Sequence, residues 1–205
     1  MHTKQGMQKL DMRDTRIYRV YKVRRLKMKR AIFYAMVAAA AMVAAAAGPF
    51  GLEMGMTLDE VAVSCGGRAP VDIGGGRYIV TPQKANPLFA ECIAWVSESE
   101  GLYALRANGE DVLSTPEGDE LRGEFSAVQE ALEALYGEAM LSDGDAEGQR
   151  VLQADWFPEG GDVEWLCLVA EGGGSSAYLF VQYTFTNFQS AQEATQPPSE
   201  DEGVF

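Results

Sequence analysis

Histidine is almost absent from this sequence: the chain of 205 residues holds one, His2, close to its start. Without histidine, serine and cysteine nucleophiles lack their usual activating base, so Ser-His-Asp and Cys-His catalysis are excluded for the rest of the chain. Zinc, copper and iron sites that use imidazole ligands are excluded for the same reason. We therefore predict no catalytic residues and no cofactor.

Basic residues are scarce after residue 47. Residues 1–47 carry 11 Lys/Arg and 2 Asp/Glu, whereas residues 48–205 carry 6 Lys/Arg and 28 Asp/Glu. The first part has a net charge of +9 and the second of −22, which together give the −13 of the whole chain. A body this acidic repels nucleic acids and anionic membrane surfaces, so neither is an expected partner. It attracts cationic partners instead.

The basic residues of the first part lead into an apolar run that is typical of a secretory signal. Lys27, Lys29 and Arg30 precede residues 31–47, an apolar stretch of 17 residues that ends on Ala45-Ala46-Ala47. Small residues of this kind mark a signal-peptide cleavage site. The run is mostly alanine and short for a bilayer span, so we expect cleavage and no stable membrane span afterwards. A signal anchor with a basic cytoplasmic tail is the alternative.

These shifts in charge and composition divide the chain into three parts. Residues 1–47 are the leader, in which 28–47 form the signal peptide and 1–27 an extension from an upstream start codon. Residues 48–190 form an α+β domain, and residues 191–205 form a disordered acidic tail. The predicted localisation is periplasmic or secreted, in a bacterium.

Cysteine is also rare, with three residues at Cys65, Cys92 and Cys167. Export permits a disulfide, but the odd number leaves at least one thiol free or paired between chains. The sequence does not select among the three possible pairs.

A helix is predicted to begin at Thr57, soon after the leader. Thr57 and Glu60 have the spacing of a capping box, in which each side chain accepts a hydrogen bond from the backbone N–H of the other residue. Met56 and Val61 stand at the positions of a hydrophobic staple, which sets the angle at which the chain enters the helix. An apolar face with helical spacing continues to Cys65.

Six segments have the composition, or the alternation of apolar and polar residues, that predicts strands. They are 77–81, 92–97, 101–107, 150–157, 163–170 and 176–185. The first three segments follow the helix that begins at Thr57, and the last three follow a second, longer predicted helix. The short glycine-rich connections favour antiparallel pairing. The predicted fold class is α+β, with two α-β-β-β halves and the helices packed on one face of an antiparallel sheet.

The longer helix is predicted over residues 118–136. Its apolar residues recur at spacings of four and three, which produces one seam for packing on a sheet. The seam residues are Leu121, Phe125, Val128, Leu132 and Leu135. Gly123 costs this helix roughly 1 kcal/mol relative to alanine. We interpret it as room for a close approach to the sheet.

The segment that begins at Asp143 resembles part of a calcium-binding loop. Asp143, Asp145 and Glu147 occupy the first, third and fifth positions of the loop, and Gly148 occupies the sixth. The twelfth position should hold a bidentate glutamate and holds Ala154 instead. We interpret the segment as a solvated acidic loop and keep a calcium site at Asp143, Asp145 and Glu147 as the alternative.

The predicted domain opens on the pattern FGLxxGMTxxEV, formed by Phe50-Gly51-Leu52, Gly55-Met56-Thr57 and Glu60-Val61. This opening resembles that of small bacterial envelope modules, among them the outer-membrane assembly lipoprotein BamE (SmpA/OmlA) and the β-lactamase-inhibitor-protein-like group. Most of the mature chain is similar to uncharacterised secreted bacterial proteins, which share this opening, Gly101-Leu102, Leu135-Tyr136-Gly137 and Tyr183-x-Phe185-x-Asn187. The resemblance implies an exported protein-binding or envelope-associated module. The lipidation cysteine of the assembly lipoproteins has no counterpart at the cleavage region.

These features favour an exported, non-enzymatic protein whose partner is another protein. Structural roles are expected for Gly55, Met56, Thr57, Glu60 and Val61. One alternative is a carboxylate-dependent hydrolase of an envelope glycan, since acidic residues are abundant although no pair stands out. Another is a binder of calcium or of a cationic ligand.

Overall fold

The computed structural model of the protein describes most of the chain between residues 48 and 195. The described residues are 48–86, 88–109, 112–113, 119–146, 149–173 and 176–195. All of them belong to one compact unit of the chain. The predicted leader and the predicted tail from residue 196 onward lie outside the described residues.

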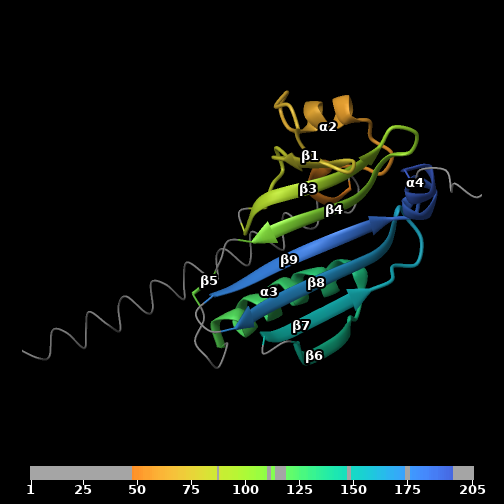
Figure 1. Ribbon diagram of the computed structural model, residues 1–205. Coiled ribbons are helices and arrows are strands. Elements are labelled where there is room, and N and C mark those ends of the chain that lie inside the picture. Colours follow the sequence, from red (N-terminus) through yellow and green to blue (C-terminus); the bar gives the residue numbers. More distant parts are fainter. Residues whose placement is uncertain are drawn as a thin grey trace, which may run out of the picture. The chain divides into compact units, whose positions relative to one another are not determined.

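One antiparallel sheet contains all nine strands of the described residues (Figure 1). Eight of these strands lie side by side in the order β1-β2-β3-β4-β9-β8-β7-β6, and the ninth, β5, pairs with β9. The bounds are β1 Val71–Gly74, β2 Arg77–Val80, β3 Phe89–Ser97, β4 Gly101–Gly109, β5 Val112–Leu113, β6 Met140–Ala146, β7 Gln149–Trp156, β8 Val163–Gly173 and β9 Ser176–Phe185.

Three α-helices and one short 3-10 helix accompany the sheet in the described part of the chain. They are the 3-10 helix η1 (Pro49–Gly51), α2 (Leu58–Ser64), α3 (Asp119–Tyr136) and α4 (Phe188–Thr195). No helix within residues 48–195, as far as these are described, combines the length and the apolarity needed to cross a membrane.

The sheet consists of two similar halves that meet between β4 and β9. Each half is a helix followed by four consecutive antiparallel strands, α2 with β1 to β4 and α3 with β6 to β9. The last strand of each half pairs with the other, in a register that runs from Ala104 opposite Thr184 to Asn108 opposite Phe180. The predicted α+β class with antiparallel sheet is confirmed, but the prediction of three strands per half was one strand short in each.

Both missed strands, β1 and β6, lie at the edges of the sheet. Every residue of β1 is exposed, and β6 contains Asp143, Gly144 and Asp145. Edge strands with exposed, polar or glycine residues lack the buried alternation from which strands are predicted. For this reason no strand was predicted at β1, and an acidic loop was predicted at β6.

One face of the sheet, the inner face, is covered by α2 and α3. The strand registers place a row of apolar residues on this face, from one half of the sheet to the other. The row consists of Val80, Cys92, Ala107, Val181, Leu168 and Ala154, all of them buried. Residues of α2 and α3 belong to the same hydrophobic cluster as this row. The helices therefore cover one continuous core that spans both halves.

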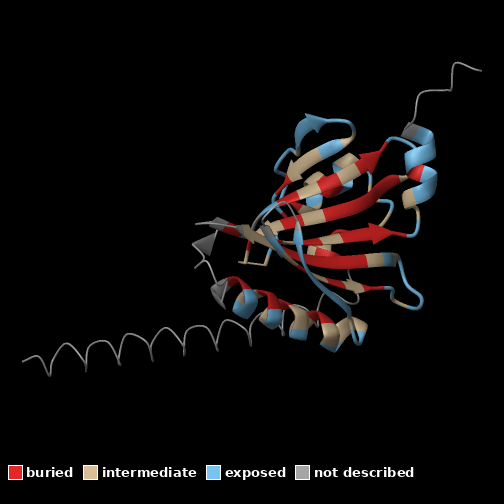
Figure 2. Ribbon diagram, turned by 60° about the horizontal axis from the view of Figure 1, so that its bottom comes forward, coloured by how far each residue is buried: buried red, intermediate tan, exposed pale blue. Residues whose placement is uncertain are grey.

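Helix α3 packs on the sheet through the predicted seam. Leu121, Phe125, Val128 and Leu132 are buried, and Figure 2 shows the buried side of the helix turned to the strands and its exposed side turned away. Gly123 is exposed, and a Cβ atom added there would meet nothing within 4 Å. The interpretation of Gly123 as room for a close approach to the sheet was therefore wrong.

Residues 50–61, which hold the FGLxxGMTxxEV pattern, pack the start of the domain against the centre of the sheet. Phe50 packs edge-on against Phe89 and Tyr183, with ring centroids 6.0 and 6.1 Å apart. Leu52 is fully buried. The predicted capping box of α2 is present: the N–H of Thr57 donates to Glu60 at 2.8 Å and the N–H of Glu60 donates to the Thr57 hydroxyl at 3.4 Å. The pKa of the Glu60 carboxyl is lowered by the bond from the Thr57 N–H and by a second bond from the Thr57 hydroxyl at 2.9 Å.

Gly55 and Met56 pair with Leu102, the second residue of β4. The N–H of Gly55 donates to the carbonyl of Leu102 at 2.9 Å, and the N–H of Leu102 donates to the carbonyl of Met56 at 2.8 Å. Gly101 has φ +68°, and a Cβ atom built on it would lie 2.1 Å from the carbonyl oxygen of Gly55. The close approach of the two segments therefore requires glycine at position 101.

Helix α4 lies on the opposite face of the sheet. Phe188 and Ala191 pack against Trp95, Tyr103 and Ala104. Two hydrogen bonds fix the start of the helix, because the side-chain amide of Asn187 donates to the carbonyls of Glu100 and Leu102 at 2.9 and 3.2 Å. Residues 191–195 are helical. The prediction that the disordered tail begins at residue 191 was therefore wrong for these five residues.

Replacing Gly101 by alanine is expected to destabilise the protein by about 3 kcal/mol or more, since strain and a backbone clash act together. Gly123→Ala is the matched control, because it changes glycine to alanine at an open helical position and should stabilise by up to about 1 kcal/mol. Urea unfolding of both variants measures the difference. Equal stabilities of the two variants would contradict the role assigned to Gly101.

Candidate functional site: the open face of the sheet

Of the helices in the described part of the chain, α4 alone lies on the face of the sheet opposite α2 and α3, at one end. We call this the open face. Its central row runs through residues that are paired from strand to strand. The row consists of Ile79, Ile93, Arg106, Gln182, Cys167, Asp155 and Met140. This row mixes apolar, polar and charged side chains, whereas the row on the inner face contains apolar residues alone.

Arg106 and two aromatic residues form the best-defined group on the open face. The guanidinium carbon of Arg106 lies 3.6 Å from the ring centre of Phe180, and Phe180 stacks on Tyr178 with centroids 6.2 Å apart and planes 18° apart. The Nε of Arg106 donates to Asn108 at 2.9 Å. The hydroxyl of Tyr178 donates to Glu171, which raises the pKa of the tyrosine. Each end of the stack is therefore held in place by a polar partner.

A second group surrounds Asp155 on the neighbouring strands. Its carboxylate accepts a hydrogen bond from the indole N–H of Trp165 at 3.0 Å and further bonds from the Gln153 amide at 2.8 and 3.0 Å. Cys167 lies opposite Asp155 and is buried. Burial, and after it the charge of Asp155, raises the pKa of this thiol to about 11, so it stays protonated and unreactive at neutral pH.

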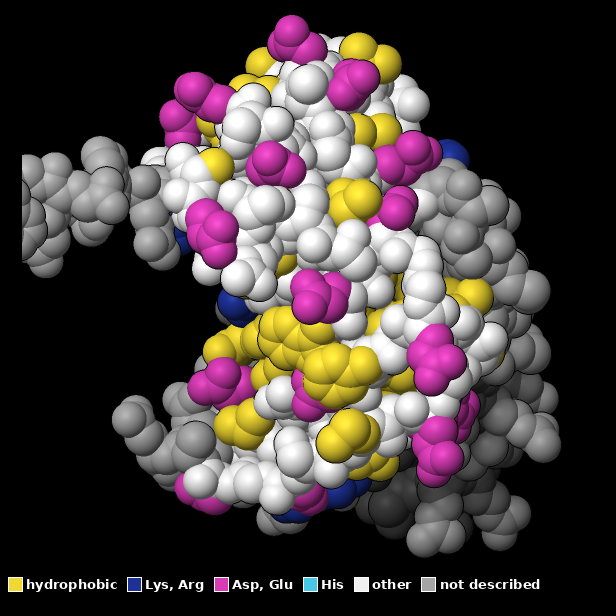
Figure 3. All heavy atoms as spheres, turned by 90° about the vertical axis from the view of Figure 1, so that its right-hand side faces the viewer, with side chains coloured by type: hydrophobic (Ala, Val, Ile, Leu, Met, Phe, Trp, Pro, Cys, Tyr) yellow, Lys and Arg dark blue, Asp and Glu magenta, His cyan; other side chains and the backbone are white. Residues whose placement is uncertain are grey.

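Large apolar side chains are exposed towards both edges of the sheet. Met140 on β6 is 68% exposed, and Phe157, the residue after β7, is 62% exposed. Val71, which is 59% exposed, lies on β1 at the opposite edge. Figure 3 shows hydrophobic side chains gathered at a hollow of the surface, with acidic side chains around them. Contiguous exposed apolar surface with a polar rim is typical of interaction sites.

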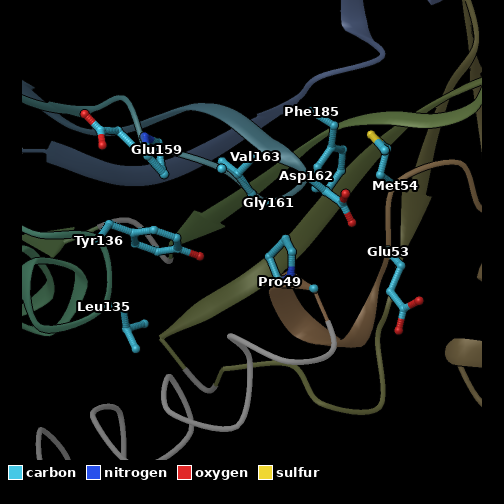
Figure 4. A pocket seen from close by; sticks show the side chains of 13 residues that line it. Pro49, Glu53, Met54, Leu135, Tyr136, Glu159, Gly161, Asp162, Val163 and Phe185 are labelled. Carbon is cyan, nitrogen blue, oxygen red and sulfur yellow. The ribbon is translucent and has the colours of Figure 1, made fainter.

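The described residues also form a pocket of about 510 Å³ beside η1, the end of α3 and the β7–β8 loop. Figure 4 shows the hydroxyl of Tyr136 pointing into this space towards Pro49. The carboxylates that line it belong to Glu53, Glu159 and Asp162, and all three residues are exposed. A catalytic acid of the glycosidase type needs a carboxyl group in an apolar environment. The pocket supplies no such environment, so the hydrolase alternative receives no support from it.

Two of the three candidate calcium residues, Asp143 and Asp145, lie on the edge strand β6. Asp143 accepts two hydrogen bonds from Arg150 at 2.6 and 3.2 Å, and Arg122 lies 3.7 Å away. The Arg150 hydrogen bond is the main cause that lowers the pKa of Asp143. Asp145 is on the same strand, and Glu147 lies outside the described residues. In the described part of the chain, no three His, Cys, Asp or Glu residues are grouped to hold a metal.

We expect no heat when the full chain is titrated with millimolar calcium. Arg150 already neutralises Asp143, and a calcium ion would have to displace it. Isothermal titration calorimetry measures this directly, and Arg150→Ala serves as the comparison in which Asp143 is less engaged. Saturable heat from the unaltered protein, lost in Asp143→Asn, would instead establish the calcium alternative.

The residues of the open face were not predicted as a site. Alternation along the predicted strand 176–185 puts Ala177, Leu179, Val181, Tyr183 and Phe185 on one face. The same alternation puts Tyr178, Phe180 and Gln182 on the other face, which was a usable indication of an aromatic surface. The position of Arg106 over Phe180 depends on the pairing of β4 with β9, which joins the two halves of the sheet.

Comparison of the chain with protein-family models, with curated proteins and with solved structures gives no match.

Proposed function

We propose that this is an exported, non-enzymatic module that binds another protein through the open face of its sheet. The observation that carries the proposal is the difference between the two faces. The inner face is closed by α2 and α3 over a continuous core, whereas the open face exposes Met140, Phe157 and Tyr178. Aromatic side chains and methionine are enriched at protein interfaces, together with arginine such as Arg106.

Rigidity of the half-buried aromatic side chains on the open face supports binding. Phe180 is held between Arg106 and Tyr178, and Trp165 is held by Asp155. Side chains that are fixed before association lose less conformational entropy when a partner docks. The open face is therefore prepared for contact with a protein surface.

Charge defines the chemistry of the partner. Residues 48–205 carry 28 acidic and 6 basic side chains. A partner with an apolar centre surrounded by lysine and arginine would complement this surface, and its association would be fast and sensitive to salt. The acidic body thus favours a basic protein over a neutral or acidic one.

Export is the second part of the proposal. It is supported by the basic residues before an alanine-rich run, by Ala45-Ala46-Ala47 before Gly48, and by the resemblance of the FGLxxGMTxxEV opening to envelope modules. We place the protein in the periplasm or outside the cell, where its partner would be another exported or envelope protein.

The test is affinity capture from extracellular and periplasmic extract of the source bacterium, with the exported protein as bait. The double variant Met140→Ser/Phe157→Ser removes two exposed apolar side chains from the open face and leaves the net charge unchanged. It should reduce recovery of a basic partner at least tenfold, as expected for interface residues, and raised salt should reduce it further.

Val63→Ser is the matched control, because Val63 is an apolar residue that is 73% exposed on α2, away from the open face. Circular dichroism of all variants establishes that they are folded. The proposal is wrong if no captured protein depends on the open-face residues, or if Val63→Ser weakens capture equally.

A further inference from the structure

Two of the three cysteines lie beside the same stretch of β2, on the inner face of the sheet. We propose that Cys65 and Cys92 form a disulfide when the protein folds in an oxidising compartment, and that Cys167 remains the single free thiol. The pairing rests on the fold alone. Only its occurrence in the cell rests on the export proposed above.

Cys65 is brought to β2 by the end of helix α2. It is the residue directly after the helix, and it is 2% exposed. Burial raises the pKa of its thiol, and the neighbouring backbone of Thr81 opposes this shift. The N–H of Gln83, two residues after Thr81, donates to the carbonyl of Ser64 at 3.2 Å. The sulfur of Cys65 is thereby placed over the end of β2, where Val80 is followed by Thr81.

Cys92 approaches the same point from β3. It is directly opposite Val80 in the antiparallel register, and Cα atoms of such pairs are about 4.5–5.5 Å apart. Cys92 and Val80 are both buried in the inner-face cluster that contains Cys65, so the Cys92 side chain points to the side on which α2 lies. The electrostatic influence of Cys65 on Cys92 agrees with this proximity.

Cys167 cannot reach either of the other thiols. It lies on β8, which is separated from β3 by β4 and β9. Three interstrand spacings amount to about 14 Å, twice the largest Cα separation of about 7 Å that a disulfide spans. Cys167 also belongs to the open face, so the sheet itself lies between its side chain and Cys65. Of the three possible cysteine pairings, the fold therefore permits only Cys65 with Cys92.

The bond forms by thiol–disulfide exchange with an external disulfide, such as oxidised glutathione or an oxidising protein disulfide. One cysteine thiolate attacks this disulfide and expels a thiol, and the second cysteine then attacks the mixed disulfide and expels the other. In total the two cysteines lose two protons and two electrons, and the external disulfide is reduced to two thiols.

Burial makes the folded state a poor substrate for this exchange. It is the main cause that raises the pKa of Cys92 to about 12, and the attacking species is the thiolate. Because Cys65 and Cys92 are each only 2% exposed, an external disulfide reaches them before α2 closes over β2 and β3. Once formed, it ties the seven-residue helix α2 to the sheet and encloses β1 and β2, the edge of the first half.

The experiment refolds the full chain in a buffer of reduced and oxidised glutathione, then counts free thiols in denaturant and maps the disulfide by mass spectrometry without reduction. One free thiol per chain is expected, with a Cys65–Cys92 linked peptide. Cys167→Ala should leave none, whereas Cys65→Ala should leave two.

Three free thiols after refolding, or a linked peptide that contains Cys167, would overturn the pairing. The peptide map of the unaltered chain decides this even if a variant fails to fold. The same map on protein recovered from cells separates the two proposals. A reduced pair there, in protein that oxidises correctly in the glutathione buffer, would contradict export and leave the pairing intact.

Discussion

The pairing of β4 with β9 is the contact on which the rest of this structure depends. It joins the last strand of each half, so that two four-stranded units become one sheet with one core. Because Ala107 stands opposite Val181 in this register, the apolar rows of both halves fall on the same face. A shift of this register by one residue would expose the apolar row of one half to water and place the open-face residues of that half in the core.

From this register follows the difference between the two faces. The inner face carries the apolar row and needs the helices α2 and α3 to cover it. The residues between those of the row point the other way, and they include Arg106, Gln182 and Phe180. The open face is therefore a consequence of the same alternation that builds the core. Its stacked Arg106 and Phe180 come from different halves of the chain.

Much of this architecture could be predicted from the sequence, because helices and buried strands have clear periodicity. The seam of α3 and the capping box of Thr57 and Glu60 are local patterns, and both are present. The edge strands β1 and β6 could not be predicted in this way, because exposed strands carry no buried alternation. Helix α4 was missed because its short polar sequence is held by Asn187 and by packing on Tyr103, which are contacts with distant segments.

The opening pattern FGLxxGMTxxEV illustrates how a sequence resemblance can have a local structural basis. Its phenylalanine packs on Phe89 and Tyr183, its central glycine and methionine pair with Leu102, and its threonine caps α2. These contacts concern folding, and none of them lies on the open face. The pattern therefore accounts for the start of the domain, while the candidate site depends on residues outside it.

The most direct test of binding through the open face is covalent surface labelling of the protein, alone and with its captured partner. A carbene reagent that modifies exposed side chains should label Met140, Phe157 and Tyr178 in the free protein. In the complex this labelling should fall several-fold, while that of Val63 stays unchanged. Unchanged labelling of the open face together with protection of Val63 would contradict the proposed role of this face.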